Sequence, residues 1–125
     1  MSVRERKYDL EDRLVKYCAN LIDIVEALPS TRSGNYIAGQ LVRCGLAPAL
    51  NYGEAQGAES RSDFIHKMKI SLKELKETRA CLKIILAKMD VGGPAALLEE
   101  NQQLIGIFAK SILTAKNNQN QDLPP

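Results

Sequence analysis

Hydrophobic residues recur along most of the chain at steps of three and four, the spacing that places them on one face of an α-helix. The N-terminal part shows this most simply, with one apolar series that continues over several helical turns. Its members are Leu10, Leu14, Tyr17, Leu21, Ile24 and Leu28. Pro29 ends this helix, because a proline disfavours the helical conformation of the residue before it. Ser30 or Thr31 can then cap the next helix.

A second apolar series runs beside the first on the same helix. Its members are Val15, Cys18, Ile22 and Val25. Two adjacent series form an apolar face that is wider than one partner helix needs. The sequence therefore predicts that this helix has more apolar surface than its neighbours within one bundle can cover.

The segment 32–57 combines helical spacing with residues that disfavour helices. Its periodic positions are Ile37, Leu41, Cys44, Pro48, Tyr52 and Ala55. An internal proline removes one backbone hydrogen bond and clashes with the preceding turn, at a cost of about 3 kcal/mol. We therefore expect a helix that is kinked near Ala47–Pro48, or one that is broken there into two pieces. Five of the eight glycines also lie in this segment, which indicates that another backbone or a partner comes close.

The third and fourth segments predict long helices with clear ends. Ser60, with Asp63 three residues later, is typical of a helix start, so the third helix is expected over 61–88. Its apolar series is Ile65, Met68, Leu72, Leu75, Arg79, Leu82, Leu86 and Met89, in which only Arg79 is charged. The run 92–94, Gly-Gly-Pro, separates it from a fourth helix over 94–117. The apolar positions of that helix are Leu97, Leu98, Leu104, Ile105, Phe108, Ile112 and Leu113.

Four such helices with short connections predict an all-α fold, an antiparallel up-down-up-down four-helix bundle with its second helix kinked near Pro48. The 125 residues fit one domain, expected over 1–117, followed by a disordered polar tail over 118–125. Hydrophobic residues make up 45% of the chain and aromatic ones only 5%, so the core is mostly aliphatic, which suits helices better than a β-sandwich.

Several classes of protein are excluded by composition. Three cysteines are an odd number, so a closed disulfide framework is excluded, and the cysteines are interpreted as small buried residues. One histidine and no Cys-x-x-Cys leave a zinc site without ligands, and no other cofactor is expected. The chain has no apolar run long enough for a membrane span and no signal peptide, so a bacterial-type cytoplasm is the expected location.

Positive charge is concentrated in the third helix. The whole chain has 17 basic and 15 acidic residues, a net charge of +2. Residues 61–88 alone contain eight basic and three acidic residues, a surplus of five. Lys69, Lys73, Lys76 and Lys83 share one face of this helix, opposite its apolar series. This pattern is typical either of a solvated helix face or of a stripe that tracks a phosphate backbone, without base stacking because no aromatic residues interleave.

Catalytic residues are not indicated by the sequence. His66 is the single histidine, and Asp63 or Glu59 lies at a distance suitable for orienting it. A lone histidine at a helix start is more often a surface or packing residue. Glu54 with Asn51, and Arg61 with Asp63, are interpreted as structural ion pairs or hydrogen bonds at helix junctions.

The stretch from Gln40 to Ile85 resembles the family called four helix bundle proteins, some members of which are encoded in intervening sequences within bacterial 23S rRNA genes. The resemblance is strongest over 51–55 and 59–67, is continued by Leu-Lys-Glu at 72–74, and extends over about 10–115. The family motif falls here on Arg43, Asn51, Glu54, Asp63, Phe64 and Glu74, which are interpreted as mainly structural. Where many members read Arg-Ser-Gly-Thr-Ser, this chain has Arg-Cys-Gly-Leu-Ala at 43–47, followed by Pro48.

The resemblance implies a ring-like homopentamer of four-helix bundles. A related branch, the accessory proteins of diversity-generating retroelements, binds nucleic acid and a reverse transcriptase through a basic surface. By this resemblance we expect a non-enzymatic cytoplasmic protein that binds RNA or DNA with low sequence specificity. Its contact residues would be Arg61, Lys69, Lys73, Lys76 and Lys83. The alternatives are a structural or protein-interaction ring with no nucleic-acid role and, third, an enzyme that uses His66 and Asp63.

Overall fold

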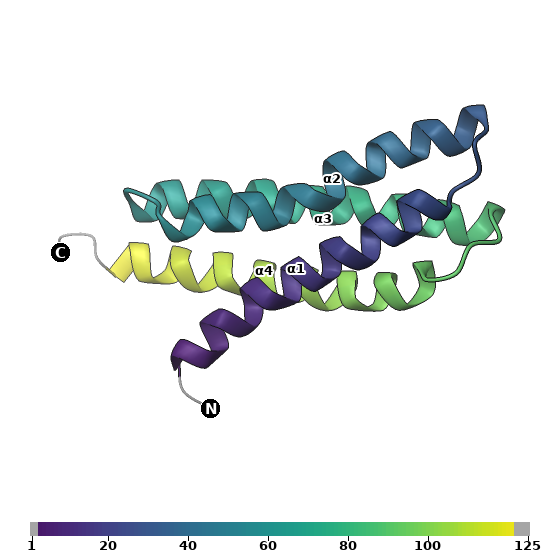
Figure 1. Ribbon diagram of the computed structural model, residues 1–125. Helices are drawn as coiled ribbons and strands as arrows, with labels where there is room; N and C mark the ends of the chain where they lie inside the picture. Colours follow the sequence, from purple (N-terminus) through teal and green to yellow (C-terminus); the bar gives the residue numbers. More distant parts are fainter. Residues whose placement is uncertain (1–2, 122–125) are drawn as a thin grey trace.

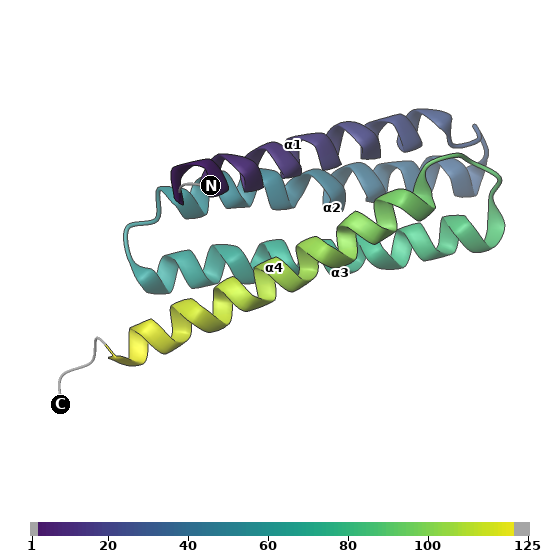
Figure 2. The ribbon, with the colours of Figure 1, turned by 90° about the horizontal axis from the view of Figure 1, so that it is seen from below.

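Four α-helices follow one another along the chain in the computed structural model, which describes the backbone of residues 3–121 and the side chains of residues 10–118. They are α1 (Val3–Ala27), α2 (Arg32–Gln56), α3 (Arg61–Lys88) and α4 (Pro94–Gln121). Each helix runs opposite to the one before it in both views (Figures 1 and 2). Residues 3–121 contain no strand, so the predicted all-α bundle is confirmed.

The four helices pack around one core, and each contacts the two helices beside it. The contacts between α2 and α3 and between α3 and α4 are the most extensive, whereas α1 packs mainly on α2 and least on α4. Figure 2 shows α1 lying along α2, in line with its more extensive packing on α2 than on α4. As a result, α1 leaves more of its surface uncovered than α3 does.

The turns between helices use the residues predicted for them. Thr31 caps α2, since its Oγ1 accepts a hydrogen bond of 3.1 Å from the backbone N–H of Gly34. Ser60 caps α3 in the same way through the N–H of Asp63, at 3.0 Å. Gly93 has a φ of 105°, a conformation that favours glycine, in the turn before α4. These local signals explain why the helix bounds agree closely with the expected ones.

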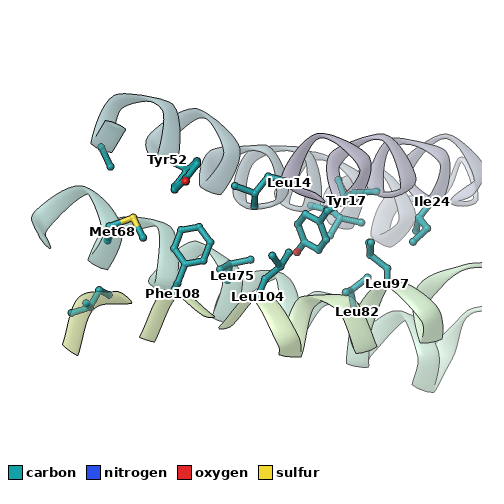
Figure 3. Close-up of a cluster of buried hydrophobic side chains, with 14 of the residues drawn as sticks. Leu14, Tyr17, Ile24, Tyr52, Met68, Leu75, Leu82, Leu97, Leu104 and Phe108 are labelled. Carbon is teal, nitrogen blue, oxygen red and sulfur yellow. The ribbon is translucent and has the colours of Figure 1, made fainter. Parts of the chain in front are cut away.

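The core consists of aliphatic side chains with a few aromatic rings (Figure 3). The inner series of α1 is buried as predicted, and so are most of the periodic positions of α2. The buried members of these two helices are Leu14, Tyr17, Leu21, Ile24, Leu41, Cys44, Pro48, Tyr52 and Ala55. Tyr52 meets Phe108 of α4 edge to face, with ring centroids 6.0 Å apart.

Helix α2 runs without interruption from Arg32 to Gln56 with Pro48 inside it, so the alternative of two separate pieces is wrong. The kink near Ala47–Pro48 stays a prediction. The expected close approach of a neighbour is found at Gly45, where a Cβ would lie 2.1 Å from Cδ1 of Leu21. At Gly39 and Gly53 a Cβ would meet nothing within 4 Å in the single chain, so a close approach of a partner at these two glycines stays a prediction.

The apolar series predicted for α3 needs correction from its second turn onward, where Ser71 is buried and Leu72 is only half-buried. Thr78 and Ile85 are buried, whereas Arg79 is only half-buried and Leu86 is 44% exposed. The buried face therefore turns by one residue relative to the expected series. A threonine can occupy a buried position because its hydroxyl finds a partner, here the backbone carbonyl of Glu74 at 2.9 Å.

The second apolar series of α1 is largely exposed in the single chain. Val15 is 61% and Ile22 is 42% exposed, while Cys18 and Val25 are half-buried. This agrees with the expectation that α1 is too apolar for its neighbours in one bundle.

Helix α4 continues past the expected end at residue 117. The tail predicted to be disordered from residue 118 is helical as far as Gln121. Residues 122–125 of that predicted tail lie outside the described residues. Among the described helices, none is long and apolar enough to cross a membrane.

Candidate nucleic-acid interface

Three of the predicted basic residues meet along one shallow groove on α3. Lys69, Lys73 and Lys76 are exposed, and they line the groove together with Leu72 and Ala80. The groove has a volume of about 570 Å³. Because the lysines are separated by steps of four and three, helical geometry places their ammonium groups along one line. The spacing in the sequence is thus sufficient to predict this part of the surface.

A fourth basic residue, Lys116 of α4, lies next to this line of lysines. Lys69 is its neighbour, and the proximity and like charge of Lys69 lower the pKa of Lys116. The sequence analysis missed Lys116. The sequence shows a lysine late in the fourth helix, but only the packing of α4 on α3 shows that it lies beside Lys69.

Arg61 and Lys83 lie apart from this cluster. Arg61, at the start of α3, lines a different and larger groove of about 770 Å³ at the end of the bundle, together with Phe64 and Lys110. Lys83 is exposed two helical turns beyond Lys76, about 10 Å along the axis. The five predicted contact residues are therefore spread along α3, and only three of them line a common groove.

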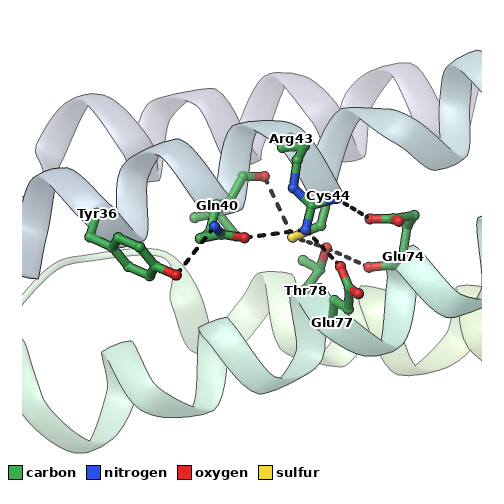
Figure 4. A network of polar contacts seen from close by, with 8 residues as sticks. Tyr36, Gln40, Arg43, Cys44, Glu74, Glu77 and Thr78 are labelled. Carbon is green, nitrogen blue, oxygen red and sulfur yellow. Dashed lines mark hydrogen bonds and ion pairs between the residues drawn. The ribbon is translucent and has the colours of Figure 1, made fainter.

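The side of α3 that faces α2 is neutralised by an ion-pair network (Figure 4). Nη1 of Arg43 lies 3.2 Å from Oε2 of Glu74, and Nη2 lies 2.9 Å from Oε2 of Glu77. The bond from Arg43 lowers the pKa of Glu77, whereas burial raises the pKa of Glu74, whose side chain is only 13% exposed. Glu77 also lines the lysine groove, so its pairing with Arg43 leaves positive charge dominant there.

The remaining residues of the family motif lie at helix junctions and at the end of the bundle. Oε1 of Glu54 forms an ion pair of 3.2 Å with Nζ of Lys67, which joins α2 to α3. Asp63 occupies the first turn of α3, where a negative charge is favourable. Phe64 packs against the core, and Asn51 is half-buried in α2. The structural interpretation of the motif stays a prediction.

A buried polar network at the centre of the bundle was missed by the sequence analysis. Nδ2 of Asn101 in α4 donates hydrogen bonds to Tyr17 Oη at 3.0 Å and to the carbonyl oxygen of Leu75 at 2.9 Å. Burial raises the pKa of Tyr17 to about 12. Oδ1 of Asn101 is buried without a partner among the described residues. Asn101 lies four residues after Leu97, within the apolar series of α4, and this spacing is the signal that would have found it.

His66 is exposed on α3, two residues before Met68 of the core. Within residues 10–118, no group of three or more His, Cys, Asp or Glu side chains could hold a metal ion.

The fold and this surface together define a class of protein, an all-helical four-helix bundle with a basic outer face on one helix. A family model described as 23S rRNA-intervening sequence protein matches residues 6–91, and the chain belongs to this family.

Comparison with solved structures supports the same fold. A crystal structure from Bacteroides thetaiotaomicron, described as a protein with unknown function from the S23 ribosomal protein family, superposes with a TM-score of 0.75 at 22% identity. The match covers 82% of this chain and 96% of that one. No curated protein matches the sequence.

Proposed function

We propose that the protein is non-enzymatic and cytoplasmic, and that it binds RNA or DNA with low sequence specificity through the basic face of α3. The observation that carries this proposal is the groove where Lys69, Lys73 and Lys76 meet, with Lys116 beside Lys69. Like charges held this close repel one another, and a bound phosphate backbone would remove the repulsion. Lys83 extends the same helix face toward the end of α3, and Arg61 adds a positive charge at the start of the helix.

Low specificity follows from the chemistry of the groove. Its apolar lining is aliphatic, from Leu72 and Ala80, and none of the described side chains that line it is aromatic, so it offers charge to phosphates without a platform for stacking bases. The ammonium group of a lysine is also a point charge on a flexible side chain, so it attracts a phosphate without recognising its geometry.

Fluorescence anisotropy with a short labelled RNA of mixed sequence, measured over a salt series, tests the proposal. Contacts to three or four phosphates predict that log K falls with log salt at a slope of about −2 to −3. The Lys73→Glu/Lys76→Glu variant should lose about ten-fold or more of the affinity at low salt. Lys16→Glu/Arg32→Glu is a matched control, because it changes the net charge equally at exposed positions of α1 and α2.

Three results would overturn the nucleic-acid proposal. One is the absence of binding at about 50 mM salt, and another is a slope near zero. The third is an equal loss in the control variant, which would show that only the net charge matters. A duplex DNA probe of the same sequence, run in parallel, decides between RNA and DNA.

A second candidate function is a structural or protein-interaction ring, and the apolar outer surface of α1 and α2 favours it. Val15, Ile22, Val42 and Leu50 are 61%, 42%, 36% and 69% exposed in the single chain. Contacts between such a face and a different face of the next copy close into a ring, here proposed as a homopentamer. A ring would also multiply the basic face, so it is compatible with nucleic-acid binding.

Light scattering of the purified protein tests the ring. Ile22→Asp/Leu50→Asp should convert the oligomer into a monomer, while Leu113→Asp, at a 59% exposed position of α4, should leave the mass unchanged. A monomeric wild-type protein would contradict the ring. A defined protein partner such as a reverse transcriptase, if retained after nuclease treatment, would favour the protein-interaction role over the nucleic-acid role.

A further inference from the structure

Cys44 of α2 and Cys81 of α3 form a pair of thiols where these two helices pack. Oγ1 of Thr78 lies 3.2 Å from Sγ of Cys44, which fixes the position of that sulfur against α3. Cys81 follows Thr78 by one helical turn, so its thiol lies on the same side of α3 as Thr78, toward Cys44. Cys44 is 1% exposed, and Cys81 is half-buried. Two sulfur atoms from distant parts of the sequence are thus neighbours at the edge of the core.

The surroundings make the two thiols chemically unequal. Hydrogen bonds from Cys81 and Thr78, together with the positive charge of Arg43, lower the pKa of the Cys44 thiol. The pKa of the Cys81 thiol is raised by its hydrogen bond to Cys44 and by burial, so Cys81 keeps its proton. This combination gives one sulfur the character of a nucleophile and leaves the other to react in a second step.

The third cysteine, Cys18 of α1, provides an internal comparison. Its thiol donates a long hydrogen bond of 3.8 Å to the carbonyl oxygen of Gly45. Burial raises the pKa of Cys18, so this thiol is the poorer nucleophile. Oxidation should therefore distinguish Cys18 from the pair.

We propose that Cys44 and Cys81 are a site of reversible oxidation, at which hydrogen peroxide joins α2 to α3 through a disulfide. The Cys44 thiolate attacks one peroxide oxygen, the O–O bond breaks, and a sulfenic acid and hydroxide form. The Cys81 sulfur then attacks the Cys44 sulfur, the S–O bond breaks, and the Cys81 proton leaves with the hydroxide as water. Two thiols and one peroxide give one disulfide and two waters, and a dithiol reductant reverses the change.

The half-buried side of Cys81 gives the oxidant its route to the pair. The resulting link would close a loop from residue 44 to residue 81 and would hold α2 against α3 beside the Arg43 ion pairs. The proposal rests on the contacts of the thiols alone and does not depend on nucleic-acid binding.

Peptide mapping of the full-length reduced protein tests the proposal directly. The protein is treated with excess hydrogen peroxide, alkylated with iodoacetamide and digested with trypsin. The three cysteines fall in separate tryptic peptides, 17–32, 44–61 and 80–83. The expected product is 44–61 linked to 80–83, lighter by two hydrogens than the separate thiol peptides, with 17–32 still alkylated. Recovery of both peptides unlinked, a link to 17–32, or a sulfinic acid without a link would each overturn the proposal.

Two variants and a stability measurement sharpen the test. Cys18→Ser should keep the link, and Cys81→Ser should abolish it. Closing a loop of this length predicts a rise in Tm of about 5–15 °C on oxidation, reversed by dithiothreitol. An unchanged Tm in fully linked protein would contradict the proposal that the disulfide holds α2 against α3. The peptide map of the wild-type protein tests the formation of the disulfide even if a variant does not fold.

Discussion

The amide nitrogen of Asn101 donates a hydrogen bond of 3.0 Å to the hydroxyl of Tyr17, and this contact joins α4 to α1 across the centre of the bundle. Asn101 is fully buried, and Tyr17 is 1% exposed. The packing of α1 against α4 is the least extensive among the neighbouring helices, so this hydrogen bond contributes more to holding these two helices together than it would elsewhere. A buried hydrogen bond of this kind favours one register of the two helices, because a shift of α1 along α4 breaks it.

This contact predicts non-additive effects of substitution. Asn101→Leu should lower the free energy of unfolding by about 1–3 kcal/mol, since it removes partners from the Tyr17 hydroxyl and the Leu75 carbonyl. Tyr17→Phe should cost about 1 kcal/mol, and the double variant should cost less than the sum by about 0.5–2 kcal/mol. Urea unfolding of all four proteins measures this difference. Additivity within about 0.3 kcal/mol would show that the hydrogen bond contributes no coupling.

Burial of the same tyrosine predicts a loss of stability at high pH. The pKa of Tyr17 is raised from 10.0 to about 12 in the folded protein. Above pH 10 the unfolded chain loses this proton while the folded one keeps it, so stability falls as pH rises from about 10 to about 12. The full effect is about 2–3 kcal/mol.

Tyr17→Phe is the control for this pH dependence. Urea unfolding at several pH values should give a shallower decline for the variant, because that titration is absent from it. Burial raises the pKa of Tyr52 as well as that of Tyr17, so the late part of the tyrosinate absorbance that belongs to Tyr17 is the part that Tyr17→Phe removes. Equal slopes for the two proteins would contradict the assignment to Tyr17.

Two glycines of α2 predict opposite effects of the same substitution. Gly45→Ala places a Cβ 2.1 Å from Cδ1 of Leu21, so this fully buried side chain, or the helices themselves, must shift, at a net cost of about 1–3 kcal/mol. Gly53→Ala meets nothing within 4 Å and should stabilise the helix by about 0.5–1 kcal/mol. Thermal unfolding of the two variants measures the contrast. A neutral Gly45→Ala would mean that α1 does not approach α2 as closely as described.

The helices themselves could be predicted from the sequence because their signals are local. Thr31 and Ser60 cap helices through N–H groups three residues away, and Gly93 adopts its positive φ within one turn. The three lysines of the groove are set by spacing on a single helix, so they too could be predicted.

The rest depends on how separate helices meet. Thr78 rather than Arg79 is buried, and its hydroxyl contacts Cys44 of α2. The spacing of apolar residues within α3 is compatible with either residue facing the core. Lys116 and Asn101 become part of their clusters only when α4 is placed against α3 and α1. The pairing of Cys44 with Cys81 joins residues that no sequence spacing relates.

Thr78 links the buried core to the thiol pair, and this predicts a combined effect of removing its hydroxyl. Thr78→Val keeps the shape but removes the hydrogen bond to Cys44 Sγ, so stability should fall by about 1 kcal/mol. Because that bond also lowers the pKa of Cys44, the variant should form its Cys44–Cys81 link more slowly at neutral pH. Thr78→Ser retains the hydroxyl and should react at the wild-type rate, although loss of a buried methyl group should cost about 1 kcal/mol. Equal rates for Thr78→Val and Thr78→Ser, measured by quenched alkylation over time, would show that Thr78 does not influence the reactivity of Cys44.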